Sequence, residues 1–403
     1  MTTAVASHRN RHAILTLIGM MLIAFNLRPA LTSIGPMLRS IGDSLSLSPV
    51  GQGVLTTLPV LFLGLAAPLA PRAACRIGME HTVLLAMLIL ALALGLRPYT
   101  GTVGLFVGTA IAGGCIGVAG VLLPGIVKRD FPAAASLLTG LYTAVLCIGA
   151  SVAAGASEPL RIAFASVSER PWQPALAFWL CPAVIATVLW WLQLDGTQLP
   201  RQFVARTKSL YRDALAWQVA LYMGLQSSMA YTVFGWLPTI LQDRGLDPIG
   251  AGFALSASIM TQITTAVAAP WIASYMRDQR IMLSAMMSLT LIGLAGCIYA
   301  PLDGVWFWVV VLGLGQGGAF SIALTLLAVR ARDAPTAAQL SGMAQGVGYT
   351  LAAFGPLAVG VLHDLFQGWQ VAGLFLGVVG AGAMAAGLGA GRDRYVGDDA
   401  TGV

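Results

Sequence analysis

Apolar stretches of about 20 residues recur along the whole chain, and each is long enough to cross roughly 30 Å of hydrocarbon as a helix. Only 9 % of the residues are charged and 57 % are hydrophobic, whereas a soluble domain carries about a quarter charged residues. No regular alternation of apolar and polar residues indicates strands, and helices are the other way to satisfy the backbone in lipid. The sequence therefore predicts an all-α membrane protein with many spans.

Twelve spans are predicted, at residues 13–38, 50–71, 79–97, 102–127, 136–157, 174–194, 214–241, 249–275, 280–300, 304–329, 337–362 and 369–390. Of the 22 Lys and Arg residues, Arg28 lies within a span and five lie on one side: Arg39, Arg97, Arg161, Arg170 and Arg244. The other sixteen lie on the side of the two chain ends. Because cytoplasmic loops carry an excess of basic residues, both termini are predicted to be cytoplasmic, in a bacterial inner membrane. This asymmetry accounts for the basic pI, so nucleic acid is not expected as a partner.

The two halves of the chain share short motifs at matching places. RDFPAAASL at 129–137 matches RDAPTAAQL at 332–340, and SPVGQG at 48–53 matches DPIGAG at 247–252. Six helices thus repeat as a second six with the same orientation. We predict an N-terminal six-helix bundle (1–194), a cytoplasmic linker (195–213) and a C-terminal six-helix bundle (214–403). Two parallel six-helix repeats are the layout of the major facilitator fold, whose substrate site lies between the halves near the midplane.

The string FNLRPALTSIGP at 25–36 places Arg28 near the middle of the first span. The residue lies roughly 15 Å from the nearer surface, too deep for its side chain to reach water comfortably. A central arginine costs about 2.5–3.5 kcal/mol unless it is paired or faces a watery cavity. All sixteen acidic residues map to loops, tails or the ends of the predicted spans. We therefore expect the planar donor fork of Arg28 to bind an anionic group of the substrate.

Pro29 predicts a break in the first helix, which would leave free backbone groups facing the cavity. Other polar side chains at comparable depth are predicted to complete the pocket: Asn26, Thr32, Tyr142, Gln226, Tyr231, Trp236, Gln262, Gln316, Gln345 and Tyr349. Together they would form a neutral polar lining around one cation. In the alternative interpretation, Arg28 hydrogen-bonds to helix-end carbonyls or to Gln and Tyr side chains and locks the bundle.

Three motifs resemble the cyanate transporter family of the major facilitator superfamily: NLRPALTSIGPML (26–38), LLPGIVKRDFP (122–132) and WQVALYMGLQSSMAYTVFGWLPTIL (217–241). That family includes members assigned to cyanate and to 2-nitroimidazole transport. The resemblance covers most of the chain and implies a twelve-helix permease with a small substrate, with Arg28, Gln226 and Trp236 carried over from the motifs. The loop PRAACRIGMEH departs from the superfamily pattern, because Cys75 replaces the usual Asp and Met79–Glu80 replace basic residues. Its gating interactions therefore cannot be assumed.

The leading hypothesis is a monomeric secondary transporter without a cofactor, which moves a small anion or polar molecule, cyanate-like or carboxylate-like, by alternating access. The main alternative is an exporter of small neutral toxic compounds such as nitroimidazoles, with Arg28 structural. An enzyme is not expected, because no His or acidic residue lies at membrane depth to act as a base or metal ligand. The five cysteines are scattered without a CxxC pair, so neither a metal site nor a disulfide is predicted. Transport direction and coupling ion stay open.

Overall fold

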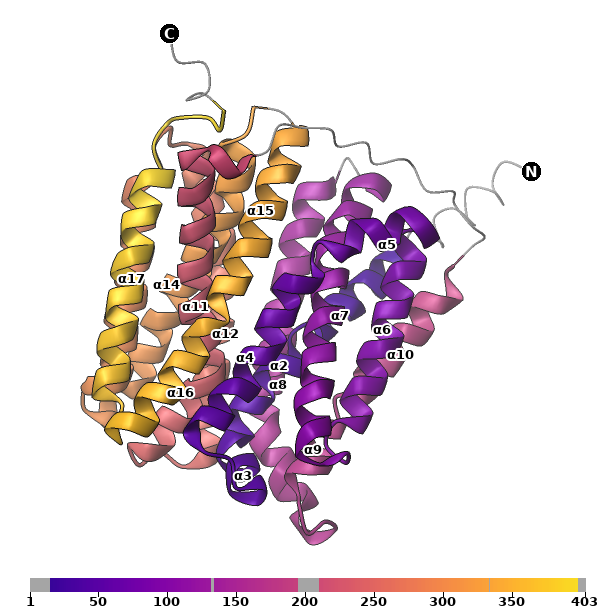
Figure 1. Ribbon diagram of the computed structural model, residues 1–403, viewed down its shortest axis with the longest axis vertical. Coiled ribbons are helices and arrows are strands. Elements are labelled where there is room, and N and C mark those ends of the chain that lie inside the picture. The colour runs from indigo at the N-terminus through magenta and orange to yellow at the C-terminus, as the bar shows by residue number, and fades with distance from the viewer. Residues whose placement is uncertain (1–14, 132–133, 195–209, 333, 398–403) are drawn as a thin grey trace.

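The computed structural model describes residues 15–131, 134–194, 210–332 and 334–397, and these residues form helices joined by turns (Figure 1). The first described segment is helical and covers residues 15–26. The following helices of the first half are α2 (Pro29–Thr32), α3 (Ile34–Leu45), α4 (Pro49–Ala66), α5 (Leu69–Ile77), α6 (Met79–Leu96), α7 (Gly101–Asp130), α8 (Ala135–Ala163), α9 (Trp172–Ala177) and α10 (Leu180–Leu192).

The second half forms its own bundle, drawn from pink to yellow in Figure 1. Its helices are α11 (Ala214–Asp243), α12 (Pro248–Ser274), α13 (Arg280–Tyr299), α14 (Val305–Val329), α15 (Ala334–Ala352), α16 (Phe354–Phe366) and α17 (Gln370–Ala390). Most of the predicted linker, residues 195–209, lies outside the described residues, so its boundaries stay a prediction. The all-helical class of the described chain agrees with the sequence prediction.

Eleven segments among the described residues are long and apolar enough to cross a membrane, whereas twelve spans are predicted. The helix outside that set is α11, which has 30 residues and is therefore long enough. It is buried along most of its length and carries polar residues such as Gln226, Ser227 and Thr232 inside the protein. Since α11 packs against α3, α12, α14, α15 and α17, protein rather than lipid surrounds much of it. Its lower hydropathy follows from this position.

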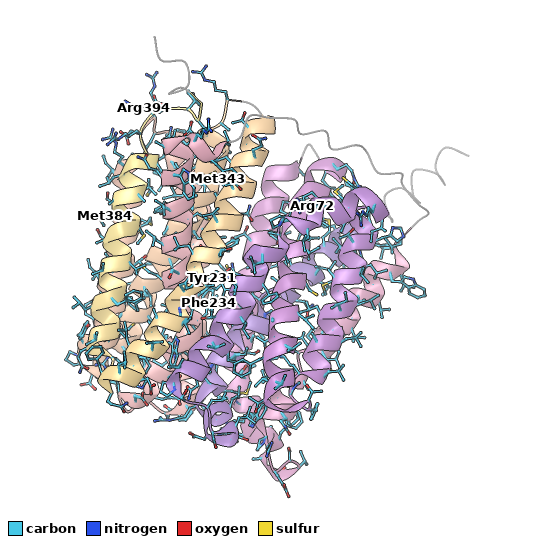
Figure 2. All side chains as sticks on the ribbon, in the orientation of Figure 1. Arg72, Tyr231, Phe234, Met343, Met384 and Arg394 are labelled. Atoms are coloured by element: carbon cyan, nitrogen blue, oxygen red, sulfur yellow. The ribbon has the colours of Figure 1, made fainter. Side chains whose placement is uncertain are left out.

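The two halves meet at one end of the molecule, which we call the Arg39 face because α3 and α11 end there. At the opposite end, where Figure 2 labels Arg72 and Arg394, the ribbons of α15 and of the first half diverge. Close packing on the Arg39 side includes Gly35 of α3, where an added Cβ would overlap the carbonyl oxygen of Phe234. In α15, by contrast, a Cβ added at Gly342 or Gly346 would have no neighbouring atom within 4 Å. The bundle is thus closed at the Arg39 face.

The unusual loop between the second and third spans has its own ion pair. Arg129, at the end of α7, contacts Glu80 of α6 at 2.5 Å and Asp130 at 2.6 Å. The hydrogen bond to Asp130, together with Glu80, raises the pKa of Arg129, so its charge is held at any physiological pH. Glu80, the acid that departs from the superfamily pattern, therefore links α6 to α7.

Glu158 lies inside a helix rather than beyond one. The fifth span was predicted to end at residue 157, but α8 continues to Ala163. The Glu158 side chain is 2 % exposed and forms a salt bridge of 2.6 Å with Arg161, one turn later on the same helix. Because the pair satisfies both charges, α8 can extend past the predicted boundary without an unpaired carboxylate.

Two polar contacts connect the halves at the Arg39 face. Arg39 of α3 forms a salt bridge of 2.8 Å with Asp243 of α11, and Gln242 donates to the carbonyl of Pro36 at 3.4 Å. The second carboxylate oxygen of Asp243 accepts a hydrogen bond of 3.1 Å from the indole of Trp369. Asp243 therefore joins the first half to the turn between α16 and α17, and this group of contacts is called the Asp243 latch.

We predict that neutralising either partner of the Asp243 latch opens the Arg39 face. Arg39→Gln and Asp243→Asn should each raise the maleimide labelling rate of a cysteine placed at Thr239, a residue that is 7 % exposed. An exposed pair contributes up to about 1 kcal/mol, which corresponds to at most a fivefold change in rate. The charge-swapped variant Arg39→Asp/Asp243→Arg should return labelling toward the unmodified protein.

The matched control is Asp303→Asn, which removes an exposed carboxylate from the turn between α13 and α14 without touching the latch. Its labelling rate should equal that of the parent protein. Equal rates in all four variants would show that the salt bridge does not hold this face closed.

Candidate functional site

The first span is interrupted at Leu27–Arg28, as Pro29 predicted. Proline has no N–H to donate to the preceding turn and disfavours helical geometry at the residue before it. The chain restarts as α2, with the carbonyl of Arg28 accepting hydrogen bonds from Leu31 (2.9 Å) and Thr32 (3.0 Å). A third helical segment, α3, follows after a turn at Ser33. Arg28 thus lies at the break between two helical segments of the first span.

Polar side chains fasten this break to the rest of the first half. Asn26 is 1 % exposed, and its amide donates to the carbonyl of Pro182 in α10 at 3.1 Å. Thr32 is fully buried and donates to the carbonyl of Ala150 in α8 at 3.0 Å. Both residues were predicted as substrate ligands, and the hydrogen bonds described here engage them in packing between helices.

Arg28 carries its charge into a group of aromatic rings from the second half. Its Cζ lies 5.5 Å from the ring centre of Phe234, 5.9 Å from that of Tyr231 and 6.0 Å from that of Phe320. These rings belong to α11 and α14, and Figure 2 shows Tyr231 and Phe234 at mid-height between the two bundles. The negative faces of such rings attract a guanidinium by about 0.5–2 kcal/mol, depending on desolvation. None of the salt bridges found in the described part of the chain involves Arg28.

Two further phenols lie within the electrostatic reach of Arg28. They are Tyr142 of α8 and Tyr349 of α15. The Tyr349 ring packs edge-to-face against Tyr231 at 6.1 Å, which continues the ring cluster along the second half. We call the three rings within 6.0 Å of Arg28, together with Tyr349, which packs against one of them, the aromatic cage: Tyr231, Phe234, Phe320 and Tyr349. All four rings come from the second half.

The cage offers both a charge and flat apolar walls. Arg28 is half-buried although it lies at mid-depth, so neighbouring residues do not enclose it completely. Tyr231 and Tyr349 are 6 % and 7 % exposed, and their hydroxyls add hydrogen-bonding groups to walls that are otherwise apolar. A site of this kind can grip a small oxyanion through the guanidinium and hold a planar group between rings.

The hydrogen bonds described for the four predicted glutamines lie within the second half. Gln226 donates within its own helix α11. Gln262 and Gln316 bond to each other at 3.3 Å between α12 and α14, inside the second half. Gln345 is half-buried and donates to Ser341 of its own helix at 2.8 Å. These four side chains therefore pack the second half in the hydrogen bonds described here.

Trp236 lies nearer the Arg39 face than the cage does. Its indole donates to the carbonyl of Pro356 at 2.9 Å and so ties α11 to α16. Its ring packs against Trp369 at 5.6 Å, and Trp369 stacks on His363 at 4.0 Å with nearly parallel planes. This aromatic stack includes Trp369, whose indole bonds to Asp243, so it supports the Asp243 latch.

Two cage residues, Phe234 and Phe320, were not predicted from the sequence. Phe234 stands three residues after Tyr231, which places both on one side of α11. Phe320 ends the glycine-rich string GLGQGGAF at 313–320. One sequence feature could have pointed to both residues. Arg28 has no acidic residue at its depth, and a cation without a carboxylate is attracted to the faces of aromatic rings, so nearby phenylalanines were candidates.

Residues 16–353 match the Major Facilitator Superfamily. The chain is 37 % identical over 380 residues to an uncharacterized transporter, YycB, of Bacillus subtilis (strain 168), covering 94 % of each protein. It is 34 % identical over 400 residues to the 2-nitroimidazole transporter of Escherichia coli (strain K12), covering 98 % of this chain and all of that one. The identity to the cyanate transport protein CynX of the same strain is 28 % over 351 residues, covering 87 % and 90 %.

A solved structure supports the fold independently. The bacterial homologue of the human lysosomal transporter Spinster, in an inward-facing and unoccupied conformation, matches 95 % of this chain and 98 % of its own with a TM-score of 0.73. The two sequences are only 14 % identical, so the likeness shows the fold alone. The chain therefore belongs to the major facilitator superfamily, in the group of cyanate and nitroimidazole permeases, and is a multi-pass membrane transporter of a small molecule.

Proposed function

We propose that the protein is a secondary transporter, working as a monomer, for small anions with a flat or linear charged group, which bind between the halves at Arg28. The observation that carries the proposal is the position of Arg28: a half-buried cation of the first half at mid-depth, with no acidic partner in the described chain, facing three aromatic rings of the second half. A bound oxyanion would neutralise the charge that the protein leaves uncompensated.

Alternating access follows from the way the halves meet. The excess of Lys and Arg on the side of the chain ends predicts that Arg72 and Arg394 lie on the cytoplasmic side. The structure would then be the state that is open inward and closed by the Asp243 latch. In the outward-open state the Arg39 face separates, which withdraws the α11 rings from Arg28 because both lie across the same interface. Substrate binding and gating would thus share α11.

The substrate class rests on charge and shape together. The relatives are named for cyanate and for 2-nitroimidazole, and a cyanate ion, a nitro group and a carboxylate all present negative or partly negative oxygen at one end. Arg28 suits that end, whereas the cage suits a ring attached to it. We extend this to aromatic carboxylates as the class that would use both features.

A second function is an exporter of small neutral compounds, with Arg28 structural. It is favoured by one observation, namely that the three ring faces at 5.5–6.0 Å already give the guanidinium neighbours without a ligand. The two functions predict different effects of removing the Arg28 charge. An anion transporter should lose affinity for anions but keep its affinity for neutral ligands, whereas an exporter of neutral compounds should show no difference between the two kinds of ligand.

Replacing Arg28 by Gln should selectively weaken anion binding. A hydrogen bond to a charged group contributes about 1.5–3 kcal/mol, so the dissociation constant for benzoate should rise roughly 10- to 100-fold. The constant for benzamide, its neutral counterpart, should change less than about twofold. Isothermal titration calorimetry on the purified protein measures both constants. Arg28→Lys should fall between, since it keeps the charge but loses the planar fork.

The control for Arg28→Gln is Arg170→Gln, which removes an exposed arginine far along the chain from the cage. It should leave both constants unchanged. If Arg28→Gln binds benzoate as tightly as the parent protein does, the anion-binding role is excluded and the exporter function is preferred.

Removing a ring face should discriminate between aromatic and non-aromatic anions. Phe320→Leu keeps an apolar side chain but loses a stacking surface worth about 0.5–1.5 kcal/mol. Benzoate uptake into proteoliposomes at low concentration should therefore fall roughly two- to tenfold, while cyanate uptake should stay within about twofold. Phe307→Leu is the matched control, because the Phe307 ring is 62 % exposed on the outside of the bundle. An equal loss for both anions would mean that Phe320 only supports the packing.

A further inference from the structure

A second cation is buried in the first half. Arg97 follows α6 directly and was counted with the loop charges from the sequence, yet its side chain is 0 % exposed. None of the salt bridges among the described residues includes it. An isolated buried charge is costly, because its lost hydration is not replaced by a counter-charge.

The hydrogen bonds of Arg97 are uneven. One terminal nitrogen, Nη1, donates to the carbonyl of Ala30 at 3.2 Å and approaches the hydroxyl of Thr109 in α7 at 3.5 Å. The other two nitrogens, Nε and Nη2, are buried and have no hydrogen-bond partner in the described structure. Nε and Nη2 form the edge of a guanidinium that grips carboxylates in bidentate pairs. The edge best suited to a counter-anion is therefore unpaired, and no acidic side chain among the described residues forms a salt bridge with Arg97.

Arg97 acts on the segment that carries Arg28. Its acceptor, Ala30, belongs to α2, the four-residue helix that begins directly after Arg28. Arg97 reaches this segment from α6 and α7 inside the first half, whereas the guanidinium of Arg28 lies against rings of α11 and α14 in the second half. Two uncompensated cations thus flank one interrupted segment, one on the inner side and one at the interface between the halves.

We propose that Arg97 is a positioning and specificity-determining residue: it holds α2 by the Ala30 carbonyl, and its uncompensated charge strengthens the binding of anions at Arg28. This inference rests on the proposed anion site. Arg97 does not touch the substrate, and its contribution acts through space and through the placement of the break. In a medium of effective dielectric constant near 20, a unit charge on the order of 10 Å away changes the affinity for an anion by roughly tenfold.

The test supplies the missing counter-charge without removing Arg97. Thr109→Asp places a carboxylate next to Nη1, where it can pair with the buried guanidinium, and Thr109→Asn is the neutral variant of the same shape. Thr109→Asp should bind benzoate about tenfold more weakly than Thr109→Asn does, with equal benzamide constants and a melting temperature at least as high. Calorimetry and thermal unfolding of the purified protein give these values.

A purely structural Arg97 predicts a different pattern. If Thr109→Asp and Thr109→Asn bind benzoate equally, or if both ligands weaken together, the electrostatic role is overturned. Should Thr109→Asp fail to fold, Arg97→Lys and Arg97→Gln decide the question, because only the loss of charge in the Gln variant should lower the ratio of benzoate to benzamide affinity. Arg28→Gln in the same assay separates the two proposals. If Arg28→Gln binds benzoate as the parent protein does, the proposed anion site is wrong. If Arg28→Gln loses benzoate binding while Thr109→Asp binds benzoate as Thr109→Asn does, only the role of Arg97 is overturned.

Discussion

The half-buried, unpaired charge of Arg28 is the constraint on which the rest of the arrangement depends. An arginine at this depth costs about 2.5–3.5 kcal/mol on insertion scales, and the described chain supplies no carboxylate to offset it. Ring faces at 5.5–6.0 Å stabilise the cation partly, each by an amount on the order of 1 kcal/mol. The charge remains half-buried and incompletely balanced, which is the condition that an anionic ligand would relieve.

Helix α11 connects this charge to the closed end of the molecule. It carries Tyr231 and Phe234 against Arg28, and nine residues later Asp243 forms the latch with Arg39. Gly35, which lies between Arg28 and Arg39 in the sequence, also closely approaches the Phe234 carbonyl, so three positions of the first half contact α11. Because α11 is a rigid helix, breaking the Arg39–Asp243 salt bridge by moving α11 away from the first half would also change its contacts with Arg28 and Gly35. The environment of Arg28 and the state of the Arg39 face are therefore set together.

Sequence patterns predicted which residues lie at membrane depth, but they could not predict how each helix is rotated about its own axis. Hydropathy located the spans, and Pro29 located the break at Arg28, because both depend on the residues of one segment. Which side of a helix faces the interface depends on the neighbouring helices, so the sequence did not point to Phe234 and Phe320, whose rings face Arg28. Arg97 shows the same limit, since a charge at the end of an apolar run reads as a loop residue, yet α2 and α7 bury it completely. Even α11 falls below the hydropathy of the other spans because its environment is protein.

The uncompensated charge of Arg28 also bears on the energetics of the proposed cycle. When an anion occupies the cage, it cancels the charge of Arg28, so the loaded site is electrically close to neutral. The empty site keeps its positive charge, and each elementary charge that crosses the full membrane potential changes the free energy by about 2.3 kcal/mol per 100 mV. A potential that is negative inside would therefore act mainly on the return of the empty carrier and favour the state open to the cytoplasm. In such a cycle the voltage sensitivity resides in Arg28 itself, and no buried carboxylate is required for the membrane potential to influence transport.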